Sequence, residues 1–136
     1  MPKFQQNPQN DTTVILTDLL ALTQSALVPV QTILETATMH LRSLVSKNSR
    51  VSGQLIEEHQ TATHGLAWLA TYSQSLEQMQ KWADGLIKAD KFGETEQLIL
   101  QITFGEYLWQ IYGGIQMNQS EVLRLQDLGL AQNDMR

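Results

Sequence analysis

The sequence of 136 residues carries 9 basic and 14 acidic side chains, for a net charge of −5, and it has no cysteine. This length fits one domain with one hydrophobic core, and the scattered basic residues exclude a concentrated surface for nucleic acid or an anionic membrane. The lack of cysteine excludes disulfides and thiolate sites and favours a reducing cytoplasm.

The first ten residues are polar and contain two prolines among glutamine and asparagine. They predict a disordered lead-in over 1–10 and contain no apolar stretch typical of a secretion signal. No apolar run in the chain approaches the roughly 20 residues that span a bilayer, so we expect no membrane-spanning segment.

The first helix is predicted to begin at a cap formed by Asp11 or Thr12 and to continue to Val45, because its apolar residues recur every three or four positions. Pro29 lies inside this pattern. A proline inside a helix removes a backbone hydrogen bond and clashes with the preceding turn. The sequence therefore predicts either a kink near Ala26 or two helices that meet there.

A connector over 46–53 separates the first helix from a second one, which is predicted to begin near Ser52 and to run to Ile87. Gly65 and Gly85 lie inside the second helix. Each glycine costs a helix roughly 1 kcal/mol relative to alanine, so close packing against a neighbour is expected at both.

A turn over 90–93 is predicted to lead into a third helix, whose first residues are acidic and suit the helix dipole. Gly113 and Gly114 are predicted to end it. A short last helix is then expected from a capped start at 118–121 to about Leu128, followed by a frayed tail over 131–136.

These elements predict an all-α fold, an antiparallel up-and-down four-helix bundle with three long helices and one short helix in a single domain over 11–130. The first helix has more apolar residues than one buried face needs. We therefore expect a homodimer that covers the excess, which comprises Leu16, Leu20, Leu27 and Val28.

Histidine and aromatic side chains of the second helix are the candidates for a small-molecule or metal site: His59, His64, Trp68 and Tyr72. The two histidines are five residues apart, about 140° around a helix, which disfavours a shared metal ion. Core packing is the more frequent use of such aromatic residues. No combination of side chains singles out a catalytic residue or a metal site.

A second alternative is a histidine phosphotransfer bundle centred on His40, in the segment Met-His-Leu-Arg-Ser. Such bundles carry an exposed helical histidine that is followed three or four residues later by lysine and a small residue. Here Arg42 comes too early and no glycine follows. A polar structural position on the first helix is the favoured interpretation of His40.

Several segments together resemble a known family. These segments, which lie at 59–72, 92–107, 113–121 and 125–130, look like the helical domain that precedes the catalytic body in certain bacterial acyl-CoA dehydrogenases, and most closely in methylsuccinyl-CoA dehydrogenases. The resemblance covers about residues 52–130. It implies an all-helical domain associated with a flavoenzyme.

A separate five-residue element, Gln110-Ile-Tyr-Gly113-Gly114, is similar to the Gln-x-x-Gly-Gly element of ordinary acyl-CoA dehydrogenases. In that family the glutamine and the glycines approach the flavin nucleotide of a neighbouring subunit. The resemblance implies the same role for Gln110, Gly113 and Gly114, whereas helix termination accounts for the two glycines equally well.

A complete acyl-CoA dehydrogenase needs several hundred residues, including a β-domain and a C-terminal bundle that carries the catalytic carboxylate. We therefore expect a non-catalytic accessory or interaction domain with no cofactor of its own, whereas the related full-length enzymes hold FAD. The expected partners are a second copy of the chain and an acyl-CoA dehydrogenase flavoprotein.

Overall fold

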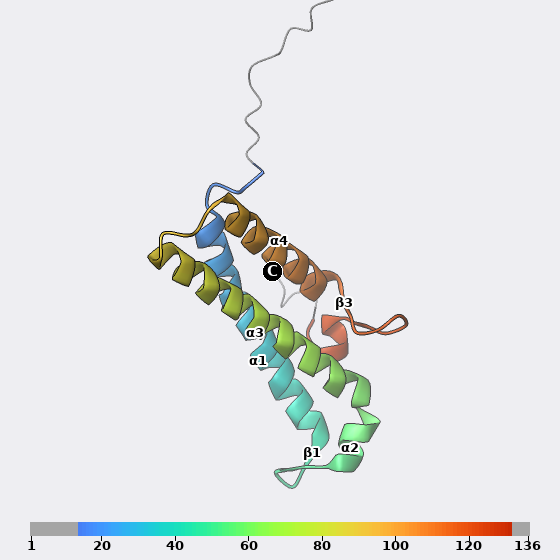
Figure 1. The fold of residues 1–136 in the computed structure, drawn as a ribbon. Helices are drawn as coiled ribbons and strands as arrows, with labels where there is room; N and C mark the ends of the chain where they lie inside the picture. The colour runs from blue at the N-terminus through green and yellow to red at the C-terminus, as the bar shows by residue number, and fades with distance from the viewer. Residues whose placement is uncertain (1–13, 132–136) are drawn as a thin grey trace, which may run out of the picture.

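The computed structural model describes residues 14–131 as a bundle of helices. Figure 1 shows the three long helices lying alongside one another in alternating directions: α1 (Leu19–Val45), α3 (Gln60–Lys88) and α4 (Glu94–Gly113). A short helix, α2 (Gly53–Glu58), precedes α3. The predicted all-α bundle with three long helices is confirmed, whereas its short helix lies before α3 and not at the predicted place near the end of the chain.

Two predictions fall on residues outside the described part of the chain. They are the disordered lead-in over 1–10 and, except for Ala131, the frayed tail over 131–136. The predicted caps Asp11 and Thr12 also lie outside the described range. Within residues 14–131, no helix combines the length and the apolar character needed to cross a membrane.

The core lies where α3 packs against both α1 and α4. The residues that face it are large and aliphatic for the most part, and their burial removes apolar surface from water. One buried hydrogen bond fixes the register of α1 against α3, because the Thr23 hydroxyl donates to Gln80 Oε1 at 2.8 Å. The central core side chains are Leu69, Leu76, Leu100, Phe104, Leu123 and Leu128.

The first helix begins at Leu19, so the predicted start at Asp11 or Thr12 is wrong. The Gln101 side chain of α4 holds the segment before α1 by two backbone hydrogen bonds. Its Oε1 accepts from the Leu16 amide at 2.8 Å, and its Nε2 donates to the Val14 carbonyl at 2.8 Å. These bonds satisfy backbone groups that would otherwise favour an earlier helical turn.

The proline in α1 does not divide the helix. α1 is continuous from Leu19 to Val45 and includes Pro29, so the predicted meeting of two helices is wrong. Of the four apolar residues that predicted a homodimer, three are exposed and one is half-buried: Leu16, Leu20 and Val28 are exposed, and Leu27 is half-buried. Dimerisation through this face stays a prediction.

The predicted connector over 46–53 is a tight β-hairpin. Strand β1 (Ser46–Lys47) pairs with the antiparallel strand β2 (Arg50–Val51), and Asn48 and Ser49 form the turn with φ angles of 53° and 62°. Two successive residues at positive φ are typical of a type I′ turn, which matches the twist of the strands. Asparagine tolerates this conformation, whereas serine adopts it at a cost.

Replacing Ser49 by glycine is therefore expected to stabilise the protein by up to about 1 kcal/mol, because glycine adopts positive φ without a Cβ clash. Equilibrium unfolding in urea measures the change. Ser46→Gly, in extended backbone at the start of the hairpin, serves as the control and is expected to destabilise. A Ser49→Gly variant less stable than the parent would contradict the strain in this turn.

The predicted second helix is broken into two at His59. Ser52 caps α2 as predicted, since its hydroxyl accepts from the Leu55 amide at 3.5 Å. His59 ends α2 with φ −111° and ψ 29°, outside helical geometry, and α3 starts at the next residue. The predicted turn at 90–93 is present, and Asp90 has a positive φ of 55°.

The two glycines of α3 differ in their surroundings. A Cβ at Gly65 would lie 2.3 Å from Cδ1 of Leu123, so the predicted close packing is confirmed there. A Cβ at Gly85 would meet nothing within 4 Å, and the same prediction is wrong for this position.

The predicted last helix over 118–128 is wrong. The chain forms a second hairpin from β3 (Ile115–Gln116) and β4 (Val122–Leu123), followed by a 3₁₀ turn, η1 (Leu125–Leu128). The Asn118 side chain accepts from the amides of Ser120 and Glu121 at 2.8 and 3.0 Å. These local bonds close a loop instead of starting a helix.

Candidate functional site

Three of the four candidate side chains lie on α3 and form one row. His64, Trp68 and Tyr72 follow each other at intervals of four residues, which places them on one face of the helix. Trp68 Nε1 donates to His64 Nε2 at 3.0 Å, and the Trp68 and Tyr72 rings meet edge to face at 6.3 Å.

The row continues onto α4 through Tyr72. The Tyr72 ring stacks on Tyr107 with centroids 4.4 Å apart and 18° between the planes, and its hydroxyl donates to Gln110 Oε1 at 2.6 Å. The sequence analysis did not single out Tyr107 as a partner of Tyr72. Its spacing of three residues from Gln110 was the available signal, because i and i+3 lie on one helix face.

Burial raises the pKa of Tyr72 above its ordinary value of 10.0, and the negative charge of an ionised Tyr107 raises this pKa further. Tyrosine in the unfolded chain ionises near the ordinary value. The folded protein therefore keeps the Tyr72 proton to higher pH than the unfolded chain does. The stabilisation by neutral Tyr72 is complete below pH 10 and is lost as the pH rises through the raised pKa.

The free energy of unfolding is thus expected to fall above about pH 10, and part of this fall is expected to be absent in Tyr72→Phe. At neutral pH the same variant loses about 0.5–1.5 kcal/mol, because the hydrogen bond to Gln110 is removed. Urea unfolding between about pH 8 and pH 11 separates the two effects. An identical alkaline fall in both proteins would show that Tyr72 ionises as an exposed tyrosine does.

The remaining histidines lie apart from this row. His59 sits at the junction of α2 and α3, where its carbonyl accepts from the Thr63 amide at 2.9 Å. His40 on α1 packs against the C-terminal segment, since a Cβ at Gly129 would lie 2.3 Å from both Cδ2 and Nε2 of its ring. Residues 14–131 contain no group of three or more histidine or carboxylate side chains placed to hold a metal ion.

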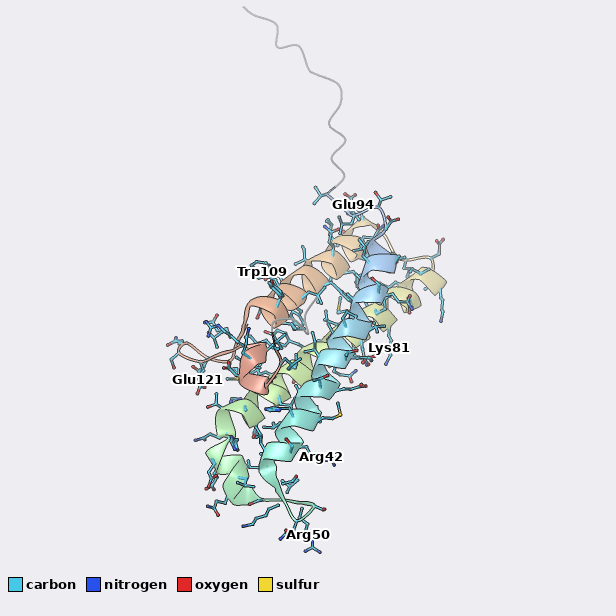
Figure 2. The ribbon with its side chains drawn as sticks, turned by 180° about the vertical axis from the view of Figure 1, so that it is seen from behind. Arg42, Arg50, Lys81, Glu94, Trp109 and Glu121 are labelled. Carbon is cyan, nitrogen blue, oxygen red and sulfur yellow. The ribbon has the colours of Figure 1, made fainter. Side chains whose placement is uncertain are left out.

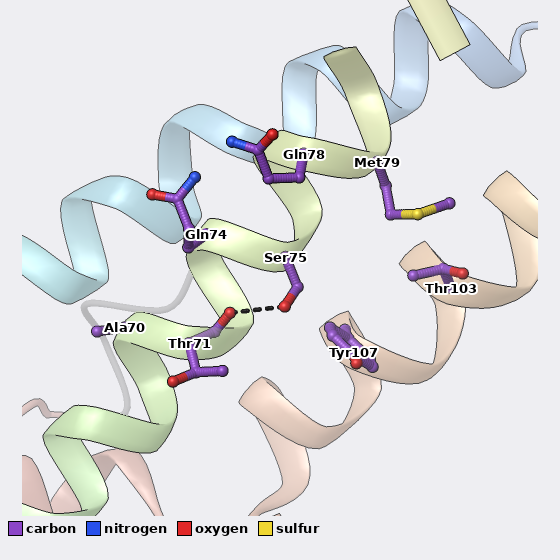
Figure 3. Close-up of a pocket in the computed structure, with 8 residues that line it drawn as sticks. All are labelled: Ala70, Thr71, Gln74, Ser75, Gln78, Met79, Thr103 and Tyr107. Carbon is purple, nitrogen blue, oxygen red and sulfur yellow. Dashed lines mark hydrogen bonds between the residues drawn. The ribbon is translucent and has the colours of Figure 1, made fainter. Parts of the chain in front are cut away.

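A groove of about 820 Å³ runs between α3 and α4 beside the aromatic row. Figure 3 shows Thr71, Ser75 and Met79 of α3 facing Thr103 and Tyr107 of α4 across it. Its lining has no charged side chain. These side chains suit neutral groups.

Gln110, Gly113 and Gly114 have clear roles within the chain. Gln110 is half-buried, and its side-chain oxygen accepts from Tyr72. α4 ends at Gly113, and Gly114, with φ 136°, turns the chain into β3. None of the three lines the groove. The approach of these residues to the flavin of another subunit stays a prediction.

Comparison with known proteins identifies a relative of the chain. No family model matches it. The sequence is 51% identical over 116 residues to (2S)-methylsuccinyl-CoA dehydrogenase of Cereibacter sphaeroides, a match that covers 85% of this chain. The chain is related to this dehydrogenase. The resemblance read from the sequence is thereby confirmed.

The match covers 21% of the methylsuccinyl-CoA dehydrogenase. The chain thus spans about a fifth of the relative's length. The row of His64, Trp68, Tyr72, Tyr107 and Gln110 offers packing contacts and neutral hydrogen bonds. A metal centre or a charged pair is not among its features.

Proposed function

We propose that the chain is a non-catalytic interaction domain that works with an acyl-CoA dehydrogenase of the methylsuccinyl-CoA type. The observation that carries the proposal is the 51% identity to a fifth of that enzyme. The fold supports it, because the polar side chains of the site hydrogen-bond to one another, as in a domain that binds through its surface. The cysteine-free sequence fits a location in the cytoplasm.

The test is native mass spectrometry of the untagged protein purified from the cells that produce it, followed by peptide identification of any bound chain. The expected result is a complex with an acyl-CoA dehydrogenase, in which flavin absorbance co-purifies with both chains. The chain alone is expected to show no turnover of methylsuccinyl-CoA with an artificial electron acceptor. Turnover by the isolated chain would overturn the non-catalytic role.

The same spectrum tests dimerisation through α1, which we propose as a second interaction because Leu20 and Val28 of that helix are exposed. A dimer mass for the isolated chain, lost on Val28→Glu, is the expected result. Val28 is 66% exposed, so this change is expected to leave the monomer fold unaltered. A monomer at all protein concentrations would contradict the dimer.

A further inference from the structure

Helix α4 is apolar on both sides, although one of these sides faces solvent. Leu100, Phe104 and Ile111 are buried in the core. On the opposite side, within an arc of about 140°, lie residues that we call the α4 outer face. They are Ile99, Ile102, Trp109 and Tyr112, with exposed fractions of 44%, 61%, 71% and 63%.

An apolar hollow adjoins the α4 outer face. It has a volume of about 260 Å³ between the start of α1 and α4, and its lining includes Leu16, Leu22 and Gly105. Leu16 and Leu22 are 52% and 50% exposed. Gly105 lies on α4 between Ile102 and Trp109, so the hollow and the outer face form one surface.

The size of this surface lies at the upper limit of what a typical monomer exposes. Its exposed side chains present on the order of 600 Å² of apolar area, since one large aromatic side chain offers about 150–250 Å². The largest apolar patch on a typical monomer covers about 300–600 Å², and one side of a standard interface buries about 800 Å². Trp109 and Tyr112, whose ring centroids are 6.4 Å apart, are of the residue types that dominate binding energy.

The charges of α4 indicate what covers the surface. α4 contains Glu94, Glu96 and Glu106 and no basic residue. Pairing of α4 with a second copy would bring these like charges together, which costs binding energy. A partner with an apolar centre and basic residues at its rim complements both the aromatic residues and the carboxylates. Figure 2 shows Trp109 and Glu94 on this same helix.

We infer that the α4 outer face and the adjoining hollow dock onto the body of an acyl-CoA dehydrogenase, with Trp109 at the centre of the contact. This inference rests on the proposed function. The relative indicates which protein covers this surface. In the dehydrogenase the matched segment makes up 21% of the polypeptide, and the remaining 79% is covalently joined to it. In such an assembly the exposed apolar face would be buried against the rest of the dehydrogenase.

The test uses hydroxyl-radical oxidation of two side chains as an internal comparison. Trp109 lies on the α4 outer face, and Met39, on α1, is 66% exposed and outside it. Oxidation is measured in the 136-residue chain and in a chimera, the Cereibacter sphaeroides dehydrogenase in which the matched 116 residues are replaced by those of this chain. Unchanged flavin content and activity show that the chimera has assembled.

Trp109 oxidation is expected to slow severalfold in the chimera relative to the chain alone, with Met39 oxidation unchanged. Protection of Met39 with Trp109 still reactive would overturn the α4 outer face as the contact and leave the interaction role intact. Protection of neither in an assembled chimera would overturn both. The outcome thus distinguishes failure of the surface from failure of the proposed function.

Sedimentation of the isolated chain is a second test that does not depend on the chimera. The parent and Trp109→Glu are expected to form the same dimer through α1, because Trp109 lies on α4, whereas Val28→Glu on α1 is expected to give a monomer. A dimer that Trp109→Glu dissociates and Val28→Glu does not would show that a second copy covers the α4 outer face. That result would overturn the assignment of the dehydrogenase as occupant.

Discussion

Replacing Gly65 by alanine is expected to lower the free energy of unfolding by about 1–3 kcal/mol, because the added methyl group overpacks the core. A Cβ at this position would lie 2.3 Å from Cδ1 and 3.0 Å from Cγ of Leu123. Leu123 is 2% exposed, so its side chain has little room to move aside. Urea unfolding followed by circular dichroism measures the loss.

Gly85→Ala is the matched control in the same helix, and it is expected to stabilise by about 0.5–1 kcal/mol because alanine is the better helix former and the site is open. Leu123→Ala alone is expected to cost about 2–5 kcal/mol. In the Leu123→Ala background, Gly65→Ala is expected to become nearly neutral. Equal costs for Gly65→Ala in both backgrounds would contradict the contact.

Gly129→Ala is expected to destabilise by about 1–3 kcal/mol for two separable reasons. Gly129 ends η1 with φ 79°, a conformation in which a Cβ is strained. The same Cβ would also lie 2.3 Å from the His40 ring, which must then move. The loss is measured by thermal and urea unfolding.

A double-mutant cycle with His40→Ala separates the two causes. In the His40→Ala background the clash is removed and only the backbone strain of Gly129→Ala remains, so the cost is expected to be smaller there. The His40→Ala change itself is expected to be mild, since this side chain is exposed overall. A cost that is the same in both backgrounds would assign the whole effect to the positive φ.

The long helices are predictable because their apolar residues recur at helical spacing and because Asp90 and Gly114, both suited to turns, follow the ends of α3 and α4. The short elements are not. Asn118 was interpreted as the start of a helix, and in the fold its side chain closes a loop. Asparagine supports both outcomes, and the decision depends on where Leu123 packs, which is a long-range contact.

The candidate site shows the same division. His64, Trp68 and Tyr72 are brought together by helical spacing alone, so this row follows from local sequence. The link from Tyr72 to Gln110 joins residues 38 positions apart and depends on how α3 docks against α4. The α4 outer face could not be predicted, because large apolar residues occur on both sides of α4 and their pattern does not reveal which side faces the core.

The two hydrogen bonds of Gln101 have a consequence for the order of folding. They join backbone groups at residues 14 and 16 to a side chain 87 and 85 positions away, and so close a loop that contains most of the bundle. Closing such a loop costs chain entropy that only prior assembly of α1, α3 and α4 offsets. Attachment of the segment before α1 to Gln101 is therefore a late event in folding, and its release is an early event in unfolding.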